Sequence, residues 1–425
     1  MQKTFKTLAC ISLLVFIFFT FIPSLQAQSY RTFKSEFDHI IENTKWKIGP
    51  FRLFPRIQLR DIGYDDNVYY QQEEEDQISD FRITAAPEIN VHLLFRNYLI
   101  FNLQEIPAYV FYFEQKRERS WDNTFSPSFK LLLFHRFVLS GEYTHIRRKR
   151  RATSEFNVRT REISERYSAS LFYETSRRTS IGLSYSQADI DYEDIDFPGQ
   201  EARLSQILSR KEKDMGINLY YGIFSASRFF IKGSYTDYTF KSPDYRWRDS
   251  YSYQVSAGIE FPEIGRIRGR FSLGFKSFHP QSGESESFEG LIGDTEIQYE
   301  FWRIRLKMGY ARDCHFSYWT SNIFFTEDQY SPGIFFYLTR SFRLDYEFRY
   351  SKMKYPEPLP ILNPDGSVAE LLRGDILRTH TAGFTVRLIE NTGIGLKVNY
   401  WERESNLNYL ERDRLFVYGY VTYEF

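Results

Sequence analysis

The sequence has little cysteine, no excess charge of either sign and, after Ile22, no long hydrophobic run. Two cysteines among 425 residues, Cys10 and Cys314, cannot form a disulfide framework or a thiol-rich metal site. The 55 basic and 55 acidic residues cancel, so no positive field favours nucleic acid as a partner. A mean hydropathy of −0.47 with 26% charged residues excludes a bundle of membrane-spanning helices.

Aromatic residues are abundant: 32 Tyr and 41 Phe help to bring the aromatic share to 19%. A soluble core needs far fewer, whereas the two aromatic girdles of a membrane barrel would use them. The closing stretch Leu415–Phe425 alternates between an apolar face and a second face of Phe, Tyr, Thr and Glu, as a strand does. An aromatic last residue is typical of outer-membrane barrels, so we predict that this strand, with Tyr423 and Phe425, closes a barrel.

The N-terminal region predicts export. Residues 1–27 combine a basic start (Lys3, Lys6) with the apolar run Leu8–Ile22 and a small residue at Ala27, which is the pattern of a cleaved signal peptide. Residues 28–50 form a polar leader that we expect in the periplasm or in the barrel mouth, with a short helix near Ser35; an unstructured leader fits the sequence equally well. Residues 51–425 are then the barrel.

From Phe51 onward one unit repeats: two alternating segments joined by a very short turn, followed by a longer charged loop. Eight short turns and nine longer loops divide this region into 18 segments. We therefore predict an all-β fold, a transmembrane antiparallel β-barrel of about 18 strands (16–18), with short periplasmic turns and longer extracellular loops.

The alternation alone does not separate a barrel from a soluble sandwich. In the segment 266–277 the apolar face carries Phe271 and Leu273, and the other face carries Arg268 and Arg270. Three further patterns favour the barrel: near-equal strand lengths, aromatic residues toward the strand ends, and a long run of hairpins without long crossovers. The apolar face is therefore expected to meet lipid and the charged face to line the lumen.

The first predicted strand and the segment after it carry a family resemblance. Phe51-Arg-Leu-Phe-Pro-Arg-Ile-Gln-Leu-Arg-Asp-Ile-Gly-Tyr-Asp-Asp-Asn-Val-Tyr69 resembles the opening of the beta-barrel porin 2 family. The resemblance implies an outer-membrane barrel, in some members associated with exopolysaccharide systems, and it implies no reaction. Asp65, Asp66 and Asn67 fit the start of a loop, and a calcium site there lacks the further ligands of a calcium-binding loop.

Charged side chains of both signs occupy the predicted lumen face. Opposed basic and acidic rows would order water and select polar or charged solutes. They would equally form cross-strand ion-pair ladders that rigidify the wall, for which a tight turn at Trp302 predicts Glu300 opposite Arg303 and Glu296 opposite Lys307. The predicted lumen-lining residues are Arg52, Arg56, Arg60, Glu88, His92, Arg266, Arg268, Arg270, Asp294, Glu296, Glu300, Arg303, Arg305, Lys307, Arg343, Asp345, Glu347 and Arg349.

Catalytic and cofactor motifs are absent from the sequence. The seven His residues are scattered, with no HExxH pair, nucleophile elbow or phosphate-binding loop. His279 and His315, with Asp313, form the one group near the extracellular rim that could be compared with a catalytic cluster. We expect no catalytic, cofactor-binding or metal site, and no enzyme activity.

The function expected from these patterns is that of a porin-like channel or export conduit for polar solutes in the outer membrane of a Gram-negative bacterium. The expected partners are outer-membrane lipid, the barrel assembly machinery, and polysaccharide or small polar solutes. Two alternatives remain: a structural, assembly or surface-binding barrel with an occluded lumen, and a hydrolase embedded in a barrel. The sequence leaves open the oligomeric state and whether the loop 355–375 constricts the pore or projects outward.

Overall fold

The computed structural model describes residues 33–72, 77–153, 155, 159–175, 178–194, 203–223, 227–282, 285–319, 321–362 and 368–425. The predicted signal peptide, residues 1–27, and the start of the predicted leader lie outside these ranges. Within them, none of the helices combines the length and the apolar character that crossing a bilayer would take.

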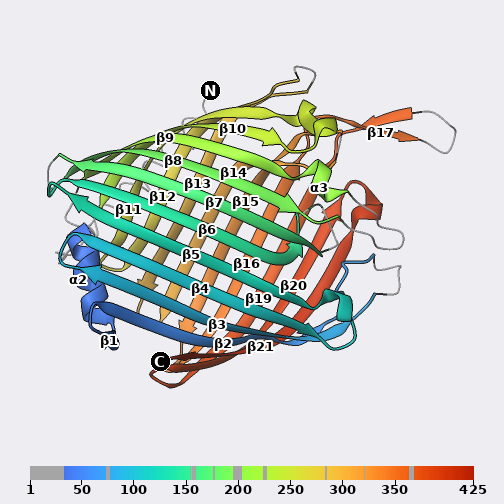
Figure 1. Ribbon diagram of the computed structural model, residues 1–425. Coiled ribbons are helices and arrows are strands. Elements are labelled where there is room, and N and C mark those ends of the chain that lie inside the picture. The colour runs from blue at the N-terminus through green and yellow to red at the C-terminus, as the bar shows by residue number, and fades with distance from the viewer. Residues whose placement is uncertain are drawn as a thin grey trace, which may run out of the picture.

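Antiparallel strands form one closed wall, in which each strand pairs with its neighbours in sequence (Figure 1). The sheet has 19 strands, of which the short β1 (Trp46–Ile48) is an addition at one rim, so 18 make the wall and the predicted fold is confirmed. The wall strands are β2 (Phe51–Asp65), β3 (Asp80–Phe95), β4 (Leu99–Tyr112), β5 (Ser120–Leu133), β6 (Phe137–Arg151), β7 (Arg159–Glu174), β8 (Thr179–Tyr192), β9 (Arg210–Gly222), β10 (Arg228–Phe240), β11 (Ser250–Ile264), β12 (Ile267–Pro280), β13 (Phe288–Phe301), β14 (Ile304–Phe316), β15 (Phe324–Tyr337), β16 (Phe342–Lys354), β19 (Gly374–Ile389), β20 (Thr392–Ser405) and β21 (Arg412–Glu424).

The outer surface is apolar, as the alternation predicts. On β12 the outward side chains of Phe271, Leu273 and Phe275 are 47–49% exposed, whereas Ser272 among them is 6% exposed. Because exposing such a continuous apolar surface to water would be unfavourable, this surface is the one that contacts lipid. Outward aromatic rings also pair across neighbouring strands, with centroid separations of 4.9 Å for Tyr143–Tyr167, 5.1 Å for Tyr235–Tyr253 and 5.0 Å for Tyr310–Tyr330.

The eight short turns lie where the sequence predicts them, but the predicted register at one turn is wrong. Phe301 pairs with Ile304, so Glu300 lies opposite Arg305 and Glu296 lies opposite Gly309. Trp302 adopts a left-handed φ of 53°, and both Trp302 and Arg303 stand outside the ladder. The loop therefore contains two residues, and every pairing beyond it shifts by two positions relative to the prediction.

Both ends of the chain meet at the barrel seam. The wall closes between β2 and β21, from Arg56 opposite Glu424 to Asp65 opposite Phe416, and Tyr423 lies opposite Ile57. β21 stops short of the first residues of β2, and β1 pairs with that remaining edge. Lys45 Nζ donates to Asn391 Oδ1 at 2.7 Å, and the Trp46 ring lies 6.5 Å edge-on from the ring of Phe425.

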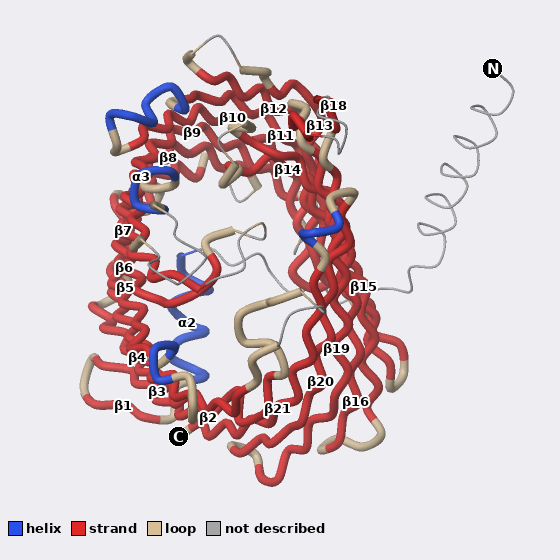
Figure 2. The backbone as a smooth tube through the Cα atoms, turned by 90° about the vertical axis from the view of Figure 1, so that its right-hand side faces the viewer, coloured by secondary structure: helices blue, strands red, loops and turns tan. Residues whose placement is uncertain are grey.

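The helix α2 (Phe33–Asn43) lies inside the barrel at the end of the short turns (Figure 2). Its apolar side chains Phe33, Phe37 and Ile40 are buried against lumen-facing residues of the wall. Those wall residues are Phe54, Leu94, Ile100, Leu132 and Val138. Glu36 adds a 2.7 Å ion pair with Lys130, so the helix narrows the periplasmic end of the lumen.

At the opposite end, two hairpins bend away from the wall and into the lumen. The pairing of β5 with β6 ends at Arg147, although β6 and β7 continue to pair with each other as far as Arg151 and Arg159. In the same way β13 and β14 last pair at Gly293 and Arg312, while β14 and β15 continue. Figure 2 shows loops crossing the interior of the ring. The hairpin of β17 (Leu359–Leu362) and β18 (Val368–Leu371) instead projects from the rim (Figure 1), and the tip of the loop 355–375 lies outside the described residues.

Four short helical segments complete the described elements. α3 (Leu204–Ile207) and the 3-10 turns η1 (Lys116–Glu118), η2 (Pro243–Arg248) and η3 (Asn408–Leu410) all lie in loops at the extracellular end.

Candidate functional site: the lumen and its extracellular mouth

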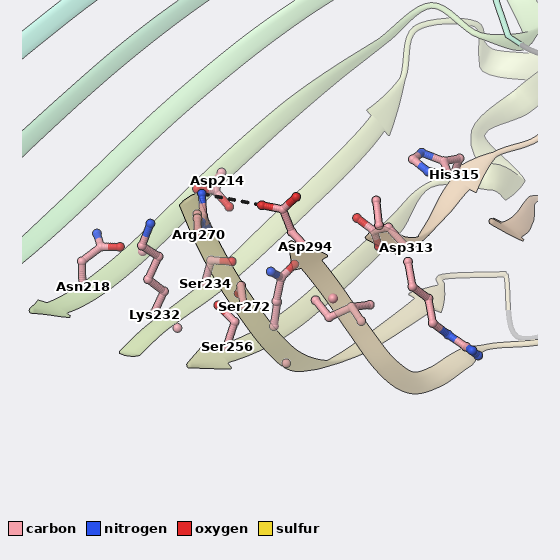
Figure 3. Close-up of a pocket in the computed structure, with 18 of the residues that line it drawn as sticks. Asp214, Asn218, Lys232, Ser234, Ser256, Arg270, Ser272, Asp294, Asp313 and His315 are labelled. Atoms are coloured by element: carbon pink, nitrogen blue, oxygen red, sulfur yellow. Dashed lines mark ion pairs between the residues drawn. The ribbon is translucent and has the colours of Figure 1, made fainter. Parts of the chain in front are cut away.

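The lumen contains a central cavity of about 540 Å³ on the inner face of β8 to β15. Its lining is hydroxyl-rich and charged, and Figure 3 shows these side chains extending from neighbouring strands into one space. They include Asp214, Asn218, Lys232, Ser234, Ser256, Arg270, Ser272, Asp294, Asp313 and His315.

Two further cavities continue the central one toward the two ends of the barrel. A cavity of about 480 Å³ shares Ser184 and Asp214 with it and reaches Glu36 of α2. A cavity of about 370 Å³ shares His315 and Glu327 with it and reaches the extracellular hairpin of β6 and β7. The shared lining residues therefore place the three cavities in a row between the periplasmic helix and the hairpin of β6 and β7.

A serine-rich wall in this row is a feature that the charge pattern did not reveal. Lumen-facing serines recur on β5 to β8 and again on β10 to β12, often two residues apart on one strand. Period-two serine on the face opposite the apolar residues is the sequence signal that would have found them. The serines of this wall are Ser128, Ser140, Ser168, Ser170, Ser184, Ser186, Ser234, Ser256 and Ser272.

Many of the sequence-predicted lumen residues form cross-strand or same-strand ion pairs. Each such pair on a partly solvated wall contributes little on its own, and together they stiffen it. The pairs are Arg56–Glu88 at 3.7 Å, Arg270–Asp294 at 3.8 Å, Arg305–Glu300 at 2.6 Å, Lys307–Glu347 at 3.3 Å and Arg343–Asp345 at 3.4 Å.

The remaining predicted residues have other surroundings. Arg266 and Arg303 are not on the wall: both lie in turns, where the guanidinium of Arg266 lies 5.7 Å over Phe301 and Arg303 donates to the carbonyl of Leu338. The other predicted residues have neutral neighbours. Arg52 donates a hydrogen bond to the Gly49 carbonyl, Arg268 donates one to the Gln298 side chain, and Glu296 accepts one from the same glutamine. His92 packs against Phe54, and Arg60 and Arg349 lie opposite Thr84 and Thr379 on the neighbouring strands.

The polar groups singled out near the extracellular rim, Asp313, His315 and His279, do not form one cluster. The ring nitrogens of His279 lie 2.5 Å from the Ser277 hydroxyl and 3.1 Å from the Ser287 hydroxyl. Asp313 pairs with Lys276 at 2.8 Å and His315 faces Glu327 at 3.6 Å, both on the lumen side, while His279 packs against Tyr251. Asp65 binds the guanidinium of Arg414. Across the described ranges, no three His, Cys, Asp or Glu side chains gather closely enough to hold a metal ion.

Glu155 connects the inward-bent hairpins across the mouth. It lies beyond the end of β6 and is 4% exposed. Its carboxylate accepts a hydrogen bond from the Ser317 hydroxyl at 2.9 Å and one from the Tyr318 amide at 2.7 Å, both beyond the end of β14. Its carbonyl accepts from Arg403 of β20, and Arg373 lies 3.8 Å from its carboxylate. We call this set, Glu155 with Ser317, Tyr318, Arg373 and Arg403, the mouth latch.

Neighbouring cations and rings fix the same hairpins. The guanidinium of Arg151 lies 4.0 Å from the ring centroid of Tyr70 and 4.7 Å from that of Trp401, so it ties β6 to the β2–β3 loop and to β20. Arg248 is fully buried and donates to the carbonyls of Ile207 and Ser317. Burial lowers the pKa of Arg248 to about 10, which still leaves it charged at neutral pH. The described residues of these loops are thus bonded to one another across the mouth.

Neither a protein-family model nor a curated protein matches the sequence, so the resemblance to the beta-barrel porin 2 family stays a prediction. Solved structures do match the fold. Pseudomonas aeruginosa OpdQ has a TM-score of 0.50 at 9% identity, over 89% of this chain and 98% of that chain. A BenF-like porin from Pseudomonas fluorescens Pf-5 has a TM-score of 0.50 at 10% identity, over 89% and 99%. At such identities the match shows the fold alone. Together with the apolar belt, that fold makes this chain an outer-membrane β-barrel.

Proposed function

We propose that the protein is a porin-like channel of the outer membrane that passes small polar solutes through a mouth narrowed by its own hairpins. The row of three cavities between α2 and the hairpin of β6 and β7 carries this proposal, because hydroxyl and charged groups contribute to the lining of each cavity. A wall of 18 strands is wide enough to hold water between its side chains. We propose no catalytic role. The link to exopolysaccharide export, which rests on the family resemblance, would require the latch to open.

Planar-bilayer recording of the refolded full chain tests the proposal. We expect a steady ohmic current in potassium chloride, and swelling of protein-loaded liposomes in small sugars but not in large oligosaccharides. A heat-modifiable gel shift verifies beforehand that the barrel has folded, and heat-denatured protein is the blank. A correctly folded protein that passes no current, even after the latch is broken, would exclude a channel.

A second candidate function is a barrel that stays shut and binds at its surface. The buried latch and the projecting β17–β18 hairpin favour it. The two candidates differ in one measurement, since a permanently occluded barrel would remain silent with Glu155 replaced and a latched channel would not.

The latch should respond to pH through Glu155. Burial raises the pKa of the Glu155 carboxyl, and Arg373 and the hydrogen bonds offset this only in part. The closed latch therefore binds a proton that a solvated Glu155 releases, so closure is most favourable below the ordinary Glu pKa of about 4.3 and weakens as pH rises through the raised value. Burial also raises the pKa of Tyr318 and Tyr355, and that of Arg373 is raised as well, so these groups keep their neutral-pH charge in this window.

We accordingly expect the open fraction of the channel to increase as the pH rises above the ordinary Glu pKa of about 4.3, measured as mean current at fixed voltage. Glu155→Gln keeps the size of the side chain and an acceptor oxygen but cannot titrate, so its current should be nearly independent of pH. An unchanged pH profile in Glu155→Gln would assign the dependence to another group.

A further inference from the structure

We propose that Lys232 forms a binding site for anionic sugars, that is, solutes with several hydroxyl groups and one carboxylate or phosphate. The proposal rests on the channel function above and names a solute class for it. Lys232 is on β10, and its side chain enters the central cavity next to Asn218 (Figure 3). The cross-strand neighbours are Asn218 of β9 and Ser256 of β11.

The charge of Lys232 is not neutralised by an ion pair. Among the residues that the structure describes, no carboxylate oxygen lies within 4.0 Å of its ammonium group. The nearby cations are already matched: Arg228 pairs with Glu260 at 2.5 Å, and Arg270 lies 3.9 Å from Glu260 and 3.8 Å from Asp294. Three cations share two carboxylates here, which leaves one positive charge at Lys232.

Aromatic rings hold this ammonium group in place without cancelling its charge. Lys232 Nζ lies 4.9 Å from the ring centroid of Phe230 and 5.5 Å from that of Tyr220. Phe230 is fully buried, and its ring lies so close to Gly258 that a Cβ there would come within 2.6 Å of it. The rings form a rigid floor, so the lysine loses little further conformational entropy when an anion binds.

The hydroxyl groups beside Lys232 match the rest of the proposed solute. Ser234, Ser256 and Ser272 line the same cavity, and so does the Asn218 amide, which donates to Ser184 at 3.1 Å. Serine hydroxyls both donate and accept, as sugar hydroxyls do. A volume of about 540 Å³ is within the range of pockets for small ligands.

The carboxylates that line the cavity are bonded to other groups, so an anion can approach Lys232. Asp313 is engaged by Lys276 at 2.8 Å. Asp214 accepts from the Thr236 hydroxyl at 2.8 Å and lies at the boundary with the neighbouring cavity, four strand positions from Asn218. An anion would therefore be held at Lys232 and repelled at Asp214, which places the site in the central cavity.

The test compares Lys232→Met with Lys130→Met and Lys232→Arg in the reconstituted full chain. Lys130 lines the neighbouring cavity and pairs with Glu36, so its replacement removes the same charge from the lumen at another place. Binding is measured as the concentration at which gluconate, glucose 6-phosphate or glucose half-saturates its own flux into liposomes. Where the wild-type mouth passes too little, all variants carry Glu155→Lys as well.

Lys232→Met should raise the half-saturating concentration of gluconate, of glucose 6-phosphate or of both by roughly tenfold, with that of glucose unchanged. Lys232→Arg keeps the positive charge, so its half-saturating concentration for the anion should stay near the wild-type value. The same is expected of Lys130→Met. An effect on gluconate alone assigns a carboxylate site, and one on the phosphate alone assigns a phosphate site. Unchanged anion binding in Lys232→Met, or an equal effect of Lys130→Met, would overturn the proposal. An absence of potassium chloride current from both the unmutated protein and Glu155→Lys would instead refute the channel itself.

Discussion

Replacing Phe271 by Arg should destabilise the inserted barrel by about 2–4 kcal/mol. Phe271 lies within β12, faces outward and is 47% exposed, so its side chain contacts the hydrocarbon region. A guanidinium there loses its hydration and finds no counter-charge, because the cross-strand neighbours are Ile259 and Thr295. Urea-dependent folding into lipid vesicles, followed by the heat-modifiable gel shift, measures the change.

Ser272→Arg is the matched control, since it adds the same group one position along the same strand. A shift of one residue moves the side chain to the other face, where Ser272 opens into the central cavity beside Asp294. We expect a change within about 1 kcal/mol for this variant. Equal destabilisation by the two substitutions would contradict the assignment of the lipid-facing and lumen-facing sides.

Glu155→Lys should open the mouth. The substitution replaces the buried carboxylate 3.8 Å from Arg373 by a cation. Arg403 bonds to the main-chain carbonyl of residue 155, so that hydrogen bond does not depend on the side chain. Breaking a buried charge pair in this way costs about 3–5 kcal/mol, so the population of the closed latch should fall by about two orders of magnitude or more. Single-channel recording should then show a conductance or an open fraction at least roughly twice that of the wild type.

Glu193→Lys is the control for this experiment. Glu193 follows β8 at the same end of the barrel and pairs with Arg161 at 2.9 Å, but its side chain is 53% exposed. The net charge changes equally in the two variants, so any general effect of charge on the ion concentration at the mouth appears in both. If Glu193→Lys raises the current as much as Glu155→Lys does, the latch is not the barrier.

The wall was predictable because its signals are local. Alternation at period two, short turns and an apolar face are each contained in a dozen consecutive residues, and a closed 18-strand barrel follows when they repeat. The register between neighbouring strands was harder to predict. The sequence near Trp302 does not reveal whether one or two residues leave the ladder, and the left-handed φ of Trp302 decides it.

The mouth latch was not predictable, because nothing local distinguishes an inward hairpin from an outward loop. Glu155 stands between Ser154 and Phe156 in a short mixed stretch that carries no strand or helix pattern of its own. Its partners Ser317 and Arg403 are 162 and 248 residues away, so their proximity emerges only when the barrel has closed. Lys232 was not among the predicted lumen residues for a different reason. Only the absence of an ion-pair partner among the described residues sets it apart, and the sequence does not show which charges are paired.

The seam has a consequence for the order of folding. Lys45 and Asn391 are 346 residues apart, and the edge of β2 that β1 covers lies beside the last strand of the chain. Every other pairing in the wall joins consecutive wall strands, with only the β17–β18 hairpin between β16 and β19, so each hairpin can form as soon as its two strands exist. Joining the ends must wait for all of them and has the largest loop-closure entropy of any contact in the wall. We therefore expect a nearly complete, still open sheet to be the longest-lived intermediate, with its two unpaired edges as the sites where aggregation competes with folding.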